Sequence, residues 1–450
     1  MDWLFRFLEA PLIWLSHRST PKSKLAELAP RNALGVCADD IPFSLSESDL
    51  GRHAYILGST GCGKTSLILA LIEEDIRREH SFVVVDHRGD LVAGALGLCD
   101  TLDIDPEKIT LLDLREQHKI QGFNPLAGAG EPYIRALHVL DVLADEAESW
   151  GVQLEETLRS ALILLSEARE PITKLELLFY DSAFRSKCLS RCTDTPLLTF
   201  WERYAAMSKD KQQAWALPVL NKVTSLLAVP VLREVLGSAS GLDLGELLNR
   251  KGHILLVSLA VDELHRSGRM VGSLVVSAIS REMLGRVNVP ESARNPVRLY
   301  VDEFENMASE SFESLIAEGR RFALSLVLSH QTLNQLPARL RSVVRNNVGV
   351  QMLFQVGFED AKQVLNELPK EFTLEDIRRL GIGQAIVLNR NGTAQTIQFK
   401  KPRPPKPRAA IDAFRERVLA SLPLATAFDN KVDKPDEAPE QLGLEDWLCD

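Results

Sequence analysis

The segment GSTGCGKT, residues 58–65, constrains the fold most strongly. It stands between the apolar run of residues 53–57 and the stretch SLILALIEEDI, which has helical apolar spacing. A glycine-rich turn between a buried strand and a helix is the context of a phosphate-binding P-loop. Its glycines let successive backbone N–H groups and the helix N-terminus face phosphates. The sequence therefore predicts a nucleotide site.

Within this P-loop, Lys64 is expected to reach the β- and γ-phosphates, and the Thr65 hydroxyl to hold Mg²⁺. The expected cofactors are therefore ATP and Mg²⁺. The residues expected to surround the phosphates are Gly58, Ser59, Thr60, Gly61, Cys62, Gly63, Lys64, Thr65 and Ser66.

Length and composition bound the rest of the chain. With 450 residues, 45% of them hydrophobic and 25% charged, it has the composition of a soluble globular protein of two or three domains. Its six cysteines show neither a CxxC pair nor zinc spacing, which favours a reduced, cytoplasmic chain. The formal net charge of −10 argues against a simple basic nucleic-acid binder. A ring lined by basic residues and acidic outside would escape that objection.

The first eighteen residues are rich in aromatic and aliphatic side chains but are broken by charges and a proline. They are too short and too interrupted to span a membrane. Three interpretations stay open for them: peripheral contact with the inner face of the cytoplasmic membrane, docking on a partner, and packing against the protein's own body.

Along the chain, strand and helix patterns alternate on both sides of a helical block. Apolar strand runs are expected at residues 81–86, 108–114, 253–260, 297–306, 323–331, 348–356, 384–390 and 394–400, the last two joined by an Asn-Gly hairpin turn. Between residues 130 and 245 every apolar pattern has helical spacing, and its aromatic residues suit a core.

This alternation predicts five segments. They are an N-terminal aromatic segment, linker and lead-in strand (1–50), a first part of the nucleotide-binding domain (51–129), an inserted all-α domain (130–245), a second part of the nucleotide-binding domain (246–400), and a proline-rich basic linker with a short helix and an acidic tail (401–450).

Polar residues that follow two of the later strands complete the predicted site. Asp302 and Glu303 end one strand, and we expect Asp302 to hold the Mg²⁺ shell and Glu303 to take a proton from the attacking water. Gln331 ends the next strand, where an amide can orient that water. Arg320 and Arg321 end the helix between these strands, and two interpretations stay open for them: a solvent-facing pair, or an arginine finger supplied to a neighbouring subunit's nucleotide.

These motifs, in their order along residues 50–400, resemble the HerA/FtsK superfamily of ring ATPases. They are GSTGCGKT, VVVDHRGD, FNPL, LYVDEFEN and EGRRFALSLVLSHQ, and within the superfamily they look most like type IV secretion coupling proteins of the TraG/TrwB kind. The resemblance implies a RecA-like P-loop domain with an inserted all-α domain. It matches Lys64 and Thr65 to Walker A and Asp302 and Glu303 to Walker B. It also matches Gln331 to the glutamine after the following strand, Arg320 to the arginine finger, and Arg52 to an arginine that precedes the P-loop and is expected to contact nucleotide.

The resemblance implies a homo-hexameric ATPase that moves DNA, or DNA–protein substrates, together with secretion or conjugation machinery. Two alternatives stay open: a nucleotide-controlled platform that recruits protein substrates, favoured by the net charge and the acidic tail, and an ATPase that partners a defence nuclease. Typical coupling proteins carry an N-terminal transmembrane pair, whereas this chain has only the short aromatic segment.

Overall fold

The computed structural model describes residues 33–422, apart from residues 38, 39, 117, 118, 146, 148, 239, 240, 308, 309, 402 and 405. The aromatic segment of residues 1–18 and the acidic tail lie outside the described residues. In the described part of the chain, none of the helices combines the length and apolar character needed to cross a bilayer.

A single sheet organises the described residues. Its eleven strands follow the order β2-β1-β11-β10-β9-β3-β8-β7-β4-β6-β5. Their bounds are β1 Gly35–Cys37, β2 Pro42–Phe43, β3 Ala54–Leu57, β4 Ser81–Asp86, β5 Ile109–Asp113, β6 Ile254–Ser258, β7 Val297–Asp302, β8 Leu324–His330, β9 Val350–Leu353, β10 Gln384–Asn389 and β11 Ala394–Phe399.

The seven strands from β9 to β5 run parallel, so their carboxyl ends share one edge of the sheet. At the other side, β10, β11, β1 and β2 add on antiparallel. The interior strand β4 is buried along its whole length, as expected for a parallel strand covered on both faces.

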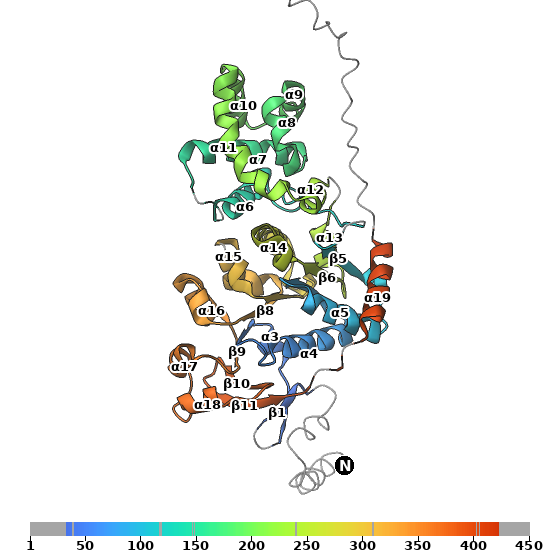
Figure 1. Ribbon diagram of the computed structural model, residues 1–450, viewed down its shortest axis with the longest axis vertical. Coiled ribbons are helices and arrows are strands. Elements are labelled where there is room, and N and C mark those ends of the chain that lie inside the picture. The colour runs from blue at the N-terminus through green and yellow to red at the C-terminus, as the bar shows by residue number, and fades with distance from the viewer. Residues whose placement is uncertain are drawn as a thin grey trace, which may run out of the picture.

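Helices cover both faces of this sheet. Their bounds are α3 Glu47–Leu50, α4 Lys64–Arg77, α5 Asp90–Thr101, α14 Val261–Leu284, α15 Glu310–Glu318, α16 Ala338–Asn347, α17 Phe358–Leu365, α18 Leu374–Arg378 and α19 Arg408–Ser421. Because side chains alternate along a strand, β3 sends Ile56 into the core under α4 and α5, and Leu57 into the core under α14 and α15 (Figure 1).

Between β5 and β6 the described residues form helices and no strand, and most of these helices stand beyond α14, away from the sheet (Figure 1). They are α6 Pro132–Asp145, α7 Val152–Ala168, α8 Leu175–Tyr180, α9 Ser182–Leu189, α10 Thr195–Ala205, α11 Lys209–Leu227, α12 Pro230–Gly237 and α13 Leu244–Asn249. Trp201 and Tyr204 are fully buried among them, with ring centroids 5.4 Å apart, so these aromatic side chains are core residues.

A buried polar network joins the P-loop helix to the strand that ends in Asp302. Asp75 of α4 is fully buried, forms an ion pair with Arg298 of β7 and accepts a hydrogen bond from the Tyr300 hydroxyl at 2.5 Å. Arg298 also reaches Glu47 of α3 at 3.1 Å. The network ties together three segments that are far apart in the sequence and that all belong to the nucleotide-binding fold.

The expected α/β fold with inserted helices is confirmed, but the segments at the two ends of the described chain differ from the expectation. Residues 33–50, expected to be a linker and a lead-in strand, form β1, β2 and α3, and β1 pairs with β11. At the other end α19 packs against α5. Strands of two and three residues are too short to show a period, so the sequence pattern does not reveal them.

Candidate nucleotide site

Three adjacent parallel strands bring the predicted site residues to one edge. In the sheet register Leu57 of β3 lies opposite His330 of β8, and Ser329 of β8 lies opposite Asp302 of β7. The P-loop directly follows Leu57, Gln331 follows His330, and Glu303 follows Asp302. Residues more than 230 positions apart in the sequence therefore meet at the carboxyl edge, where open α/β sheets bind ligands.

The P-loop has the backbone geometry of an anion site. Gly61 and Gly63 have φ of 78° and 114°, a left-handed conformation that glycine adopts without strain. Gly63 is the N-cap of α4 and supplies no side-chain cap, so the first N–H groups of a 14-residue helix face the loop uncapped. A Cβ on Gly58 would lie 2.6 Å from Phe354 Cβ, which explains the glycine there. Uncapped helix N–H groups favour phosphate.

Lys64 lies over the loop that precedes it. Its Nζ donates hydrogen bonds to the carbonyl oxygens of Gly58 and Ser59, at 2.6 and 3.0 Å. The ammonium group is therefore held at the rim of the phosphate-binding turn. Thr65, one residue on, is exposed in the first turn of α4.

A chain of side-chain contacts connects the P-loop to the predicted base. Thr60 Oγ1 donates to Gln331 Oε1 at 3.0 Å, and Gln331 Nε2 donates to Glu303 Oε1 at 2.8 Å. Arg88 Nη2 lies 3.7 Å from the same Glu303 oxygen. Glu303 is 20% exposed, so its carboxylate is shielded but reachable by water. The Gln331 side chain therefore contacts both the P-loop and Glu303.

The backbone around Glu303 is fixed in an uncommon conformation. Glu303 has φ of 50°, which is rare for a residue with a side chain and often marks a functional site. Its N–H donates to Asp302 Oδ1 at 3.1 Å, and the Ser329 hydroxyl donates to the same oxygen. The Asp302 carbonyl accepts from His87 Nδ1 at 2.9 Å. Burial lowers the pKa of His87. Because a carbonyl oxygen can only accept a hydrogen bond, Nδ1 carries a proton.

The neighbouring HRGD loop, residues 87–90, is held in place by the carboxylate of Asp86, the residue before it. Asp86 is buried and accepts hydrogen bonds from the backbone N–H groups of Arg88 and Val92, each at 3.0 Å. Burial raises the Asp86 pKa, an effect that these two hydrogen bonds partly offset. The loop thereby carries Arg88 to Glu303 and His87 to the end of β7.

Glu305 is a third carboxyl group near the site that sequence reasoning did not single out. Burial, reinforced by the charges of Glu303 and Asp302, raises the pKa of Glu305 to about 7. Its Oε2 has no hydrogen-bond partner among the described residues. The alternation of acidic and apolar residues in DEFEN could have pointed to it. The signal in the sequence was weaker for Arg88, His87 and Ser329, which stand only at or near the ends of predicted strands.

Arg320 lies away from its own chain's P-loop. It belongs to the 3-10 turn Gly319–Phe322 before β8, and β8 spans roughly 20 Å at about 3.3 Å per residue. Arg320 is exposed at this amino edge of the sheet. The position leaves it free to meet another subunit.

The structure places Arg52, which was expected to contact nucleotide, away from its own chain's P-loop. Arg52 stands before the amino end of β3, whose four residues span roughly 13 Å, whereas the P-loop follows the carboxyl end. The Arg52 carbonyl accepts from Gly349 N at 2.8 Å, at the start of β9. Arg52 and the P-loop lie at opposite ends of β3, so closeness in sequence does not place Arg52 at the P-loop edge.

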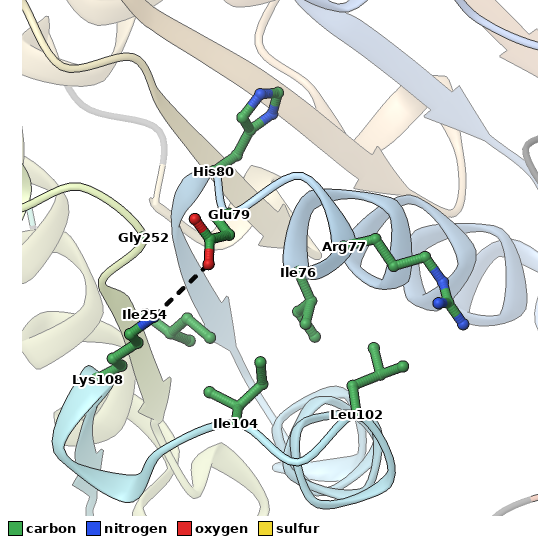
Figure 2. A pocket seen from close by; sticks show the side chains of 9 residues that line it. All are labelled: Ile76, Arg77, Glu79, His80, Leu102, Ile104, Lys108, Gly252 and Ile254. Atoms are coloured by element: carbon green, nitrogen blue, oxygen red, sulfur yellow. Dashed lines mark ion pairs between the residues drawn. The ribbon is translucent and has the colours of Figure 1, made fainter.

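A pocket in the described part of the chain also lies away from the P-loop. It has a volume of about 330 Å³ and opens between the end of α4, the end of α5 and the starts of β5 and β6 (Figure 2). Apolar side chains of Ile76, Leu102 and Ile104 face it, and Lys108 pairs with Glu79 at 3.9 Å on its rim. It therefore belongs to the amino edge and is separate from the candidate nucleotide site.

Comparisons with known proteins agree with this geometry. The family model for the central domain of the helicase HerA matches residues 34–179. No curated protein matches the sequence. The plasmid coupling protein TrwB, solved with ADP and Mg²⁺, has 17% identity and a TM-score of 0.59, over 86% of this chain and 94% of TrwB.

TrwB solved with the GTP analogue GDPNP matches with 18% identity and a TM-score of 0.56, over 85% of this chain and 94% of TrwB. VirB4 of Thermoanaerobacter pseudethanolicus matches with 15% identity and a TM-score of 0.55, over 84% of this chain and 97% of VirB4. The predicted resemblance to HerA/FtsK-type ATPases of the coupling-protein kind is confirmed, and the chain has the TrwB fold.

Proposed function

We propose that the chain is a Mg²⁺-dependent ATPase, because residues 34–179 match the central domain of HerA and the chain has the TrwB fold. The observation that carries this proposal is the meeting of the P-loop, Asp302, Glu303 and Gln331 at one edge of the sheet. TrwB itself was solved with ADP and Mg²⁺. Mg²⁺ would be held by the Thr65 hydroxyl and the Asp302 carboxylate, oxygen ligands of the kind it prefers, and would neutralise phosphate charge.

Each residue then has one task in hydrolysis. Lys64 and the N–H groups at the start of α4 bind the phosphates. Glu303 takes a proton from the attacking water while the water oxygen forms a bond to the γ-phosphorus. The bond between that phosphorus and the bridging oxygen breaks, and ADP leaves with its electrons. Gln331, which donates to Glu303 at 2.8 Å, holds that water beside the base.

We further propose that the protein works as a homo-hexameric ring which moves DNA or DNA–protein substrates for secretion or conjugation machinery, in the cytoplasm or at the inner face of its membrane. Arg320 at the amino edge supports the ring, because only another subunit can bring it to a P-loop. The fold of TrwB and VirB4 supports the transport role. Ring motors grip the nucleic-acid backbone without reading sequence.

Recruitment of protein substrates is the second candidate function. The formal net charge of −10 favours it, because a like-charged surface repels DNA. In this version nucleotide sets the assembly state and the helices of residues 132–249 recruit partners. DNA dependence of turnover separates the two functions.

Mixing two inactive variants tests the shared site. Arg320→Ala is expected to lower ATP turnover about 100-fold or more while MgADP binding stays, because a finger acts on the transition state. Lys64→Ala removes turnover but keeps Arg320. Mixed subunits are therefore expected to regain activity, since an intact P-loop then meets an intact arginine.

The matched control is Arg321→Ala, which removes the neighbouring exposed guanidinium in the same turn. It is expected to leave turnover within about twofold, since surface charges contribute little. If the mixture stays inactive while the two variants co-assemble, the assignment of Arg320 as a finger in trans is wrong.

A further inference from the structure

A fixed turn places an exposed isoleucine beside the P-loop. Ile382 is 81% exposed and lies in the turn Gly381–Gly383, just before β10. Because β10 runs antiparallel to β9, with Ile386 opposite Leu353, β10 starts at the edge where β9 and β3 end. The turn therefore lies at the P-loop edge of the sheet.

Hydrogen bonds attach this turn directly to the P-loop. Gly383 N donates to the Cys62 carbonyl at 2.8 Å, and a Cβ on Gly63 would lie 3.2 Å from Gly383 Cα. Gly383 has φ of 75°, and its carbonyl accepts from Phe399 N at 2.8 Å. Exposure of the isoleucine therefore does not come from a loose loop, because the backbone on both sides of it is anchored.

The order of the strands fixes the direction of a nucleotide in the P-loop. The hydrolytic groups Gln331 and Glu303 follow β8 and β7, on one side of β3, so the terminal phosphate points to that side. The nucleoside then lies on the other side of β3, over the ends of β9 and β10. Ile382 stands on this second side, next to the glycines that wrap the phosphates.

We infer that Ile382 packs against the face of the nucleobase, an inference that rests on the proposed nucleotide site. An apolar side chain held beside the phosphates gains contact area when a flat base covers it. The polar groups of the turn already serve the turn: Gln384 Oε1 accepts from Gly381 N at 2.9 Å, and Gln398 Nε2 donates to the Gly383 carbonyl at 3.2 Å.

This contact recognises a nucleobase by its face. An apolar surface discriminates little between bases that differ in their hydrogen-bonding edges. The contact therefore does not select adenine over guanine, and we expect the affinities for MgADP and MgGDP to agree within about threefold.

Calorimetry with three ligands tests the contact. Dissociation constants are measured for MgADP, MgGDP and inorganic triphosphate with Mg²⁺, for the unmodified full chain, Ile382→Ala and Ile382→Phe. Ile382→Ala is expected to weaken both nucleotides about fivefold to tenfold, from the loss of partly buried apolar contact, and to leave inorganic triphosphate unchanged. Ile382→Phe keeps an apolar face and is expected to retain nucleotide affinity. Ile41→Ala is the matched control, because Ile41 is also exposed, at 60%, in the turn between β1 and β2.

The outcomes distinguish this inference from the proposed function. Unchanged nucleotide affinity in Ile382→Ala overturns the base contact, and the P-loop site stands if Lys64→Ala still loses binding. Equal weakening of nucleotides and inorganic triphosphate also overturns it, because the effect then passes through the P-loop. If the unmodified protein binds none of the three ligands, both proposals fail.

Discussion

Replacement of Lys64 by alanine is expected to lower ATP turnover about 100- to 1,000-fold. The Lys64 ammonium group is held over the P-loop by the carbonyls of Gly58 and Ser59, at 2.6 and 3.0 Å, so it is already positioned where phosphate charge arrives. Charge stabilisation by a preorganised group is among the largest contributions to catalysis. Steady-state phosphate release and MgADP calorimetry give the two readouts, and MgADP affinity is expected to fall as well.

Lys108→Ala is the control for Lys64→Ala. Lys108 borders the pocket at the opposite edge of the sheet and pairs with Glu79 (Figure 2). Turnover within about twofold of the unmodified protein is expected, since an exposed ion pair contributes little. A loss of turnover in Lys108→Ala with normal turnover in Lys64→Ala would move the nucleotide site to that pocket.

Replacement of Glu303 by glutamine is expected to separate binding from chemistry. Glutamine keeps the size of the side chain and an oxygen that can accept from Gln331 Nε2, but it does not take a proton from water. Turnover is therefore expected to fall about 100- to 10,000-fold, the range for loss of a general base, while MgATP still binds. Single-turnover phosphate release and calorimetry measure the two effects.

Glu305→Gln is the matched control, two residues away in the same segment. Its carboxyl group lies near Glu303, and burial raises its pKa to about 7, but it is outside the chain of contacts from Thr60 through Gln331 to Glu303. A much smaller loss is expected. If Glu305→Gln loses more turnover than Glu303→Gln, Glu305 is the base.

Local patterns predicted the elements that carry the site. The strand expected at residues 81–86 is observed with those bounds, and the glycine turn leads into α4 as predicted. Such patterns report burial and period, which the side chains of one segment determine. The motif resemblance added that segments more than 230 residues apart belong to one site.

What the sequence does not show is how neighbours are arranged in space. Arg52 looked close to the P-loop, yet a strand of four residues places it at the other edge. The pairing of β1 with β11 joins residues 35–37 to residues 397–399, a contact without any local signal. The hydrogen bonds from Thr60 to Gln331 and on to Glu303 depend on β3, β8 and β7 being adjacent, which sequence order leaves open.

The most direct test of a DNA-moving ring is steady-state ATP hydrolysis against protein concentration, with and without double-stranded DNA, with Glu303→Gln as the blank. If Arg320 acts across subunits on a motor that grips DNA, turnover per subunit rises steeply with concentration and rises further with DNA. Turnover per subunit that is independent of both concentration and DNA would contradict a trans-acting DNA motor.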